Sequence, residues 1–159
     1  MTSSDAPKDP TTENGELELL SFRVGESEYS VDIMSVREIR GWTRATSLPH
    51  APHYVRGVIN LRGAVLPVID LALRLGLDVT EPTERNVIIV IDVDGRSIGL
   101  RVDAVSDILS FASTDLQPPP DMAADRSHAF VSALTILDGR MIRILDLAAV
   151  VPDTHDVAA

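Results

Sequence analysis

The chain has 159 residues, 45% of them hydrophobic, so it is long enough for one compact domain or for two small ones that share a core. Its formal net charge of -10 at pH 7 argues against nucleic acid or an anionic membrane as the main partner, because phosphate binding requires clustered cations. The chain lacks cysteine, which excludes disulfides and thiolate metal sites, and no apolar run approaches the roughly 18 residues of a membrane span.

Polar residues dominate positions 1–16, which predicts a flexible N-terminal tail without the apolar stretch of a secretory signal. From residue 17 onward apolar and polar side chains alternate, through Leu20, Phe22 and Val24, and a turn at Gly25 leads into a second alternating stretch. An alternation with a period of two residues predicts a β-hairpin.

A second hairpin is predicted further along the chain. Its two alternating stretches, 89–93 and 98–102, are joined by Asp94-Gly95. Both central residues of a two-residue hairpin turn need positive φ, and aspartate and glycine tolerate that conformation. The dipeptide therefore favours a tight turn between two antiparallel strands.

Two short helices are predicted, and each starts at an aspartate suited to cap its first turn. The first covers residues 70–75 and ends at Gly76, and the second covers residues 146–151 and ends at Pro152. A single helical turn over residues 52–56 is also expected.

Proline marks two further positions. Pro67 lacks a backbone N–H and removes one hydrogen bond from its strand, which predicts an edge or a bulge there. Residues 117–121 contain three consecutive prolines and are expected to form a spacer, and residues 81–84 are expected to form a linker.

The sequence contains an internal repeat. Residues 55–71 return in the same pattern as residues 131–147 at a constant offset of 76, and residues 19–39 match residues 88–108 more weakly at an offset of 69. An ancestral duplication explains both matches. Short strands in two equivalent hydrophobic halves predict a mostly β fold, with two small barrels or one double barrel.

The predicted subdomains are residues 17–83 and 84–151, followed by a C-terminal tail over 152–159. The last helix is left free to pack on either subdomain. Where the copies differ most, Arg62 in the first copy is replaced by Asp138 in the second. Such a difference marks a surface that distinguishes the two copies.

No catalytic or metal-binding motif can be recognised. His50 and His53 are three residues apart, but zinc requires at least a third protein ligand and their loop offers no nearby carboxylate. The sequence contains no glycine-rich phosphate loop, nucleophile elbow or Ser-His-Asp arrangement. The pattern indicates a binding protein without cofactor or metal. An enzyme with acid–base chemistry is the alternative, with four candidate carboxylates: Asp32, Asp70, Asp103 and Asp146.

Four stretches resemble the CheW-type coupling proteins of bacterial chemotaxis. The most specific is Arg56-Gly57-Val58-Ile59-Asn60-Leu61-Arg62-Gly63. The others are Val36-Arg37-Glu38-Ile39-Arg40-Gly41, Val105-Ser106-Asp107-Ile108 and Arg143-Ile144-Leu145-Asp146-Leu147. The resemblance covers residues 17–151, nearly all of the chain that is predicted to be ordered.

The resemblance implies two SH3-like five-stranded β-barrels, joined by a hydrophobic core, and no enzymatic activity. It implies a cytoplasmic scaffold that links the cytoplasmic tips of methyl-accepting chemoreceptors to the regulatory domain of the histidine kinase CheA, in arrays at the inner face of the membrane. The receptor tip, a helical hairpin, is expected in an apolar groove where the barrels meet. Nucleic acid and direct membrane insertion are not expected, and self-association into rings is left open.

The resemblance also implies which residues make these contacts. The kinase-binding residues would be Val36, Glu38, Ile39, Gly57 and Arg62. The receptor-binding residues would be Glu38, Arg62, Gly99 and Val105.

Each of these residues also has a structural interpretation. Glu38 and Arg62 would form an exposed ion pair, worth about 0 to 1 kcal/mol. The two glycines would allow a close approach or a strained turn, and the two valines, which are equivalent in the repeat, would be core residues. In the second copy Asp107 and Asp138 replace Glu38 and Arg62, so a partner fitted to one copy would meet a reversed charge on the other.

Overall fold

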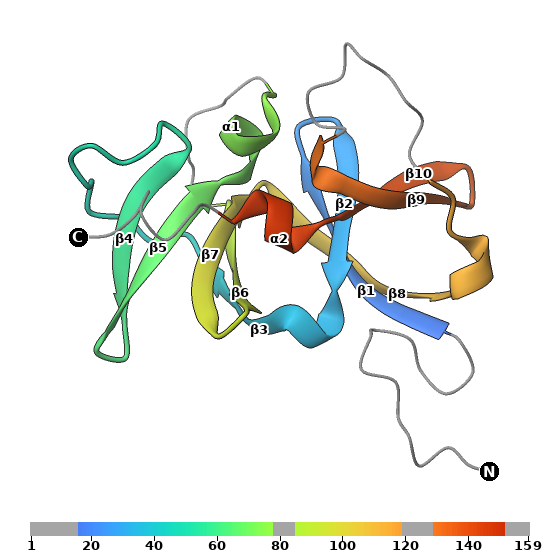
Figure 1. Ribbon diagram of the computed structural model, residues 1–159, viewed down its shortest axis with the longest axis horizontal. Helices are drawn as coiled ribbons and strands as arrows, with labels where there is room; N and C mark the ends of the chain where they lie inside the picture. Colours follow the sequence, from blue (N-terminus) through green and yellow to red (C-terminus); the bar gives the residue numbers. More distant parts are fainter. Residues whose placement is uncertain (1–15, 78–84, 119–128, 152–159) are drawn as a thin grey trace.

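The computed structural model describes residues 16–77, 85–118 and 129–151, which form two five-stranded β-sheets with short helical segments (Figure 1). Sheet A has the strand order β8 (Ala104–Ala112), β1 (Glu16–Val24), β2 (Ser27–Asp32), β10 (Arg140–Leu145) and β9 (Val131–Leu137). Sheet B has the order β3 (Val36–Gly41), β6 (Val87–Val93), β7 (Arg96–Val102), β5 (Ala64–Asp70) and β4 (Val55–Leu61). The predicted mostly β fold with two five-stranded units is confirmed. Within these ranges no strand pairing closes either sheet into a barrel.

The two sheets exchange their first hairpins. The first copy of the repeat forms β1–β5, and the second copy forms β6–β10. Sheet A combines β1 and β2 with the last three strands of the second copy, and sheet B combines β6 and β7 with the last three strands of the first. Replacing each strand by its counterpart in the other copy converts one strand order into the other. The predicted boundary between residues 83 and 84 separates the two copies of the repeat, but each sheet contains strands from both copies. The predicted subdomains, residues 17–83 and 84–151, are therefore not the two sheets.

Both predicted hairpins are present. β1 pairs with β2 around a turn at Gly25, and β6 pairs with β7 around Asp94 and Gly95, which have φ values of 52° and 80°. Positive φ at both positions matches the right-handed twist of the paired strands. β1 begins at Glu16, the last residue of the predicted N-terminal tail.

Both predicted helices are also present. Helix α1 (Leu71–Leu75) is capped by Asp70, whose carboxylate accepts from the backbone N–H groups of its first turn, and it ends at Gly76 in the left-handed conformation. Helix α2 (Leu147–Val150) is capped in the same way by Asp146. Two 3₁₀ turns cover Ile33–Ser35 and Ser113–Asp115.

The expectations for two prolines need correction. The helical turn predicted over residues 52–56 is reduced to one hydrogen bond from Val55 N–H to the Pro52 carbonyl, because Val55 already belongs to β4. The strand that carries Pro67 lies between β4 and β7, so the expected edge is wrong, whereas its pairing with β4 does contain a bulge-like register shift, between Val55 and Gly57. Pairing with β7 begins only at Val68, so Pro67 lies where β5 has a neighbour on one side alone and its missing N–H costs little.

The hydrophobic core has three parts. The largest lies between the sheets and contains residues of β1 and β2 together with residues of β6, β7 and both helices, among them Phe22, Tyr29, Ile89, Leu100 and Val150. A smaller cluster within sheet A contains Leu19 and Ile142, and its counterpart within sheet B contains Ile88 and Leu66. The first strand of each exchanged hairpin, β1 or β6, therefore contributes to two clusters, one between the sheets and one within its own sheet.

Helix α2 packs next to α1, between the two sheets in Figure 1. The Arg74 side chain of α1 donates hydrogen bonds to the carbonyl oxygens of Val150, at 2.8 Å, and Ala149, at 3.1 Å. Its guanidinium also lies over the rings of Tyr54 and Phe130, 4.2 and 5.0 Å from their centres. The end of the second copy is thus held by the first copy.

The predicted tails, the linker over 81–84 and most of the proline spacer lie outside the described residues. Within the described ranges, no helix has the length and apolar character to cross a membrane.

Candidate functional site

Glu38 and Arg62 meet on the surface of sheet B. Glu38 projects from β3, and Arg62 lies in the turn between β4 and β5. One carboxylate oxygen of Glu38 accepts from Arg62 Nη2, and the other accepts from Arg40 Nη1 at 3.1 Å. The Arg62 side chain is 67% exposed and that of Glu38 is 26% exposed, so water screens the pair and it contributes only about 0 to 1 kcal/mol to stability.

The turn that presents Arg62 has an uncommon backbone. Arg62 has a φ of 53° and Gly63 a φ of 85°, and the Asn60 side chain accepts a hydrogen bond from Gly63 N–H at 3.0 Å. Asp138, the counterpart in sheet A, has a φ of 52°. The two copies therefore hold residues of opposite charge at the same backbone position. Sheet B presents a positive charge in this turn, and sheet A presents a negative charge in the equivalent turn.

A groove of about 300 Å³ runs beside the ion pair. It is lined by Arg37, Glu38, Leu61, Arg62, Ala64, Val65, Leu66, Val90 and Ser97. Val65 is 68% exposed, which is unusual for a valine in a strand. Arg37 lies 3.7 Å from Asp92 at the same surface. The ionised residues gathered here are three arginines and two carboxylates, so the surface is locally positive on a chain of net charge -10.

The other predicted site residues do not all join this surface. Ile39 directly follows Glu38 in β3 and is 48% exposed. Val36, at the start of the same strand, is half-buried against the core between the sheets. Gly57 is buried in β4, where a Cβ would lie 2.1 Å from the Thr46 backbone oxygen. The structure thus brings Glu38 and Arg62 together, places Ile39 next to Glu38 in the edge strand β3, and buries Gly57 in the opposite edge strand β4.

Gly99 and Val105 lie elsewhere. Gly99 is buried in β7, paired with Val68 on one side and Val90 on the other, and a Cβ there would lie 2.8 Å from the Ile88 side chain. Val105 lies in β8 of sheet A and is half-buried against the central core. Gly99 has a packing role, since the Ile88 side chain occupies the space that a Cβ at this position would need.

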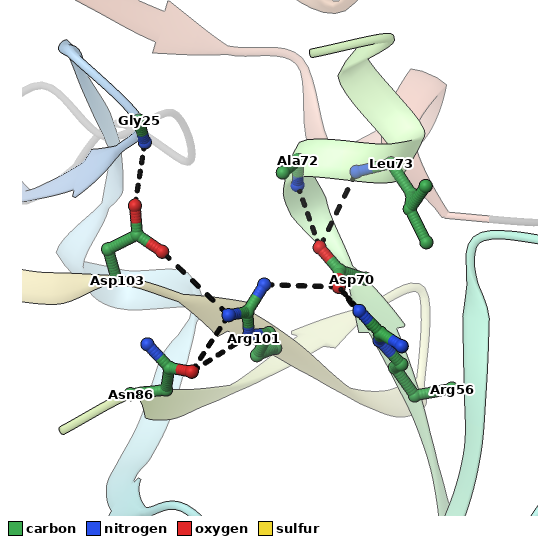
Figure 2. A network of polar contacts seen from close by, with 8 residues as sticks. All are labelled: Gly25, Arg56, Asp70, Ala72, Leu73, Asn86, Arg101 and Asp103. Carbon is green, nitrogen blue, oxygen red and sulfur yellow. Dashed lines mark hydrogen bonds and ion pairs between the residues drawn. The ribbon is translucent and has the colours of Figure 1, made fainter. Parts of the chain in front are cut away.

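A buried polar network was missed in the sequence (Figure 2). Asp70 is fully buried, and one of its oxygens accepts from Arg101 Nη1 at 3.1 Å and from Arg56 Nε at 2.8 Å. Its other oxygen accepts from the N–H groups of Ala72 and Leu73 at the start of α1. Two guanidinium groups and a helix start compensate for the burial of this carboxylate.

The network continues to the other sheet. Arg101, which is 1% exposed, donates from Nε and Nη2 to Asn86 Oδ1 at 3.2 and 2.8 Å. Asp103 follows directly after β7, 4.0 Å from Arg101, and accepts a hydrogen bond of 2.7 Å from Gly25 N–H in the β1–β2 turn (Figure 2). The sequence predicted Asp70 as a helix cap and considered it as one of four acid–base candidates, but it did not predict these ion pairs. The signal that could have found the network was the comparison of the copies, because Arg56, Asn86 and Arg101 are all replaced in the other copy.

The described residues contain no group of three or more histidine or acidic side chains that could hold a metal ion. His53, half of the histidine pair considered as a metal site, packs edge-on against the Tyr54 ring with 5.6 Å between ring centres.

Comparison with known proteins agrees with this architecture. Residues 18–155 match the family model described as CheW-like domain. The chain is 55% identical over 146 residues to the chemotaxis protein CheW of Rhizobium meliloti (strain 1021), an alignment that covers 92% of this chain and 94% of the relative. It is 35% identical to the chemotaxis protein CheW of Klebsiella aerogenes, with 82% of this chain and 78% of the relative covered.

A solved structure is also similar. The scaffolding protein TtCheW from Thermoanaerobacter tengcongensis superposes with a TM-score of 0.76 at 32% sequence identity. The superposition covers 81% of this chain and 88% of that protein.

Proposed function

This chain belongs to the CheW-like family and is a chemotaxis scaffold rather than an enzyme, and we propose that it couples the cytoplasmic tips of chemoreceptors to the regulatory domain of the histidine kinase CheA. In this role the protein works in the cytoplasm, at the inner face of the membrane, within receptor arrays. It acts by holding the receptor and the kinase side by side, so that receptor signals shift the population of active kinase. Such control needs only different contacts with two kinase states.

We propose the surface around Glu38, Ile39 and Arg62 as the kinase contact. The observation that carries the proposal is the exposed ion pair beside a groove that also contains exposed valine. Exposed arginine next to apolar surface is typical of the residues that dominate binding energy in protein interfaces. In this assignment Val36 and Gly57 act on the contact indirectly, because Val36 is half-buried and Gly57 is buried.

For the receptor we propose the apolar region around Val36 and Val105. The two valines are equivalent in the repeat, lie on the edge strands β3 and β8, and pack half-buried against the core between the sheets. Met34 and Ile108 nearby in sequence are 81% and 57% exposed. An apolar surface of this kind suits one face of a helical hairpin. Gly99 would act here only through the packing of β7.

Isothermal titration calorimetry tests the kinase contact directly. The purified chain is titrated with the regulatory domain of CheA from the same genome, and Arg62→Asp is compared with Arg23→Asp. Arg23 is exposed on β1 of sheet A, so its variant carries the same charge change away from the groove. We expect micromolar binding that Arg62→Asp weakens by about 2 kcal/mol or more, roughly 30-fold, and that Arg23→Asp leaves nearly unchanged.

Two results would contradict the proposal. Equal affinity of Arg62→Asp and the unmodified chain would remove Arg62 from the interface. Absence of binding at the highest soluble concentration would refute the kinase as partner. Circular dichroism of both variants shows whether they are folded before either result is interpreted.

A further inference from the structure

Sheet A contains a cavity at the place where sheet B holds its buried arginine network. The cavity has a volume of about 440 Å³ and lies at the start of α2. It is lined by Leu17, Leu19, Asp32, Ser35, Ser113, Leu116, Ser132, Ala133, Ile144, Leu145, Asp146 and Leu147.

The repeat aligns this cavity with the network of Figure 2, residue by residue. Asp146 is the counterpart of Asp70, and each caps the helix that follows the last strand of its copy. The backbone agrees as well, since Asp146 N–H donates to Phe130 O at 2.8 Å and Asp70 N–H donates to Tyr54 O at 2.7 Å. The strand pairing of β10 with β2 also has the register of β5 with β7.

The partners of the aspartate are different. In sheet B the carboxylate accepts from Arg101 and Arg56, and Asn86 accepts from Arg101; the residues that correspond to Arg101, Arg56 and Asn86 in sheet A are Asp32, Ser132 and Leu17. All three replacements line the cavity. The chain has thus lost both guanidinium groups from this position and has gained a second carboxylate.

The lining of the cavity contains two carboxylates, three hydroxyl groups and apolar walls, and none of its residues is a lysine or arginine. Asp32 accepts from Met34 N–H at 3.0 Å, and Asp146 accepts from Ala148 N–H at 3.1 Å, each through one oxygen. A carboxylate has about four acceptor sites on its two oxygens, so both groups keep capacity for a cation.

We propose that this cavity binds an arginine side chain that a protein partner presents, with its guanidinium group in the place that Arg101 takes in sheet B. The planar guanidinium can donate to both carboxylates and to the serine hydroxyl groups, while its methylene arm lies along the leucines of the wall. The half-buried Leu116 and Leu147 in the lining favour an arginine carried by a protein surface over free arginine, because a partner would also cover these two leucines. The site lies in sheet A, away from the Glu38–Arg62 surface of sheet B, and its existence does not depend on the kinase being the partner there.

Nuclear magnetic resonance titration with a defined peptide tests this inference. The ¹⁵N-labelled chain is titrated with acetyl-Leu-Arg-Leu-amide, and the matched peptide acetyl-Leu-citrulline-Leu-amide has the same shape without the charge. We expect saturable shifts of the amide signals of Asp32, Ser132 and Asp146 with the arginine peptide, and at least about tenfold weaker binding of the citrulline peptide. Asp32→Asn preserves an acceptor for Met34 N–H and should weaken the arginine peptide by a similar factor.

A second variant fills the cavity from within the chain. Asp32→Arg combined with Ser132→Arg introduces the residues that sheet B has at these positions, next to the aspartate they would pair with. We expect this variant to fold and to lose the shifts with the arginine peptide.

The inference is overturned by any of three results. The first is that the citrulline peptide binds as tightly as the arginine peptide. The second is that millimolar Ca²⁺, added instead of the peptide, shifts the same amide signals. The third is that the arginine peptide gives no saturable shift at about 10 mM.

Discussion

Removal of the Asp70 carboxylate should destabilise the protein far more than removal of its counterpart Asp146. Both residues cap a short helix, and loss of a cap costs about 1 kcal/mol. Asp70→Ala also leaves the Arg101 guanidinium buried without its carboxylate, and breaking a buried ion pair costs about 3 to 5 kcal/mol. We therefore expect a loss of about 4 to 6 kcal/mol for Asp70→Ala and of about 1 kcal/mol for Asp146→Ala.

Urea denaturation followed by circular dichroism measures both free energies of unfolding. In a thermal scan, a loss of 4 kcal/mol corresponds to a fall of roughly 8 to 16 °C in the melting temperature for a chain of this size. Adding Arg101→Met to Asp70→Ala should recover about 2 kcal/mol or more, because an apolar side chain then replaces a buried guanidinium that has lost its buried carboxylate partner. The reasoning is refuted if Asp70→Ala and Asp146→Ala agree within about 1 kcal/mol, or if Arg101→Met makes the first variant less stable still.

Three further substitutions test other parts of the structure. Gly57→Ala should cost about 3 kcal/mol or more in urea denaturation, since its Cβ would lie 2.1 Å from the Thr46 backbone oxygen. Gly63→Ala should cost only about 1 kcal/mol, because a Cβ at Gly63 meets nothing. Equal losses for the two variants would contradict the close contact at Gly57. Arg74→Met removes two hydrogen bonds to the end of α2 and two contacts with aromatic rings, and it should lower the free energy of unfolding by about 2 kcal/mol. A change below about 0.5 kcal/mol would show that α2 is held by apolar packing alone. Val105→Ala should weaken binding to the receptor tip, measured by calorimetry, by more free energy than it removes from the stability of the fold. A large fall in melting temperature with unchanged affinity of the folded protein would make Val105 a core residue.

Much of the local structure followed from the sequence because local rules determine it. Alternation of apolar side chains located the hairpins, and Asp94-Gly95 located a turn whose two residues need positive φ. Aspartates before short apolar segments located both helices, since a carboxylate that accepts from the first free N–H groups stabilises a helix start wherever the helix lies.

The candidate site was predictable only in part. Glu38 and Arg62 were selected through the resemblance, and their contact was expected as a surface pair, which the structure contains. Arg37 and Arg40 of β3 and Val65 of β5, which complete the surface, come from two separate places in the chain and share no sequence pattern. The burial of Gly57 and Gly99 depends on which strands lie beside them.

The sequence by itself determined that the chain has two copies of one unit, the strands and caps of each copy, and the opposite charges at Arg62 and Asp138. Only the tertiary structure decided that each sheet takes its first hairpin from the other copy. The physical reason is that the two hairpins have the same alternating pattern and similar lengths, so their edges offer equivalent hydrogen bonds to either set of strands. The choice is made by packing between residues far apart in the chain, and the same packing buries Arg101 against Asp70 and leaves Asp32 beside an open cavity.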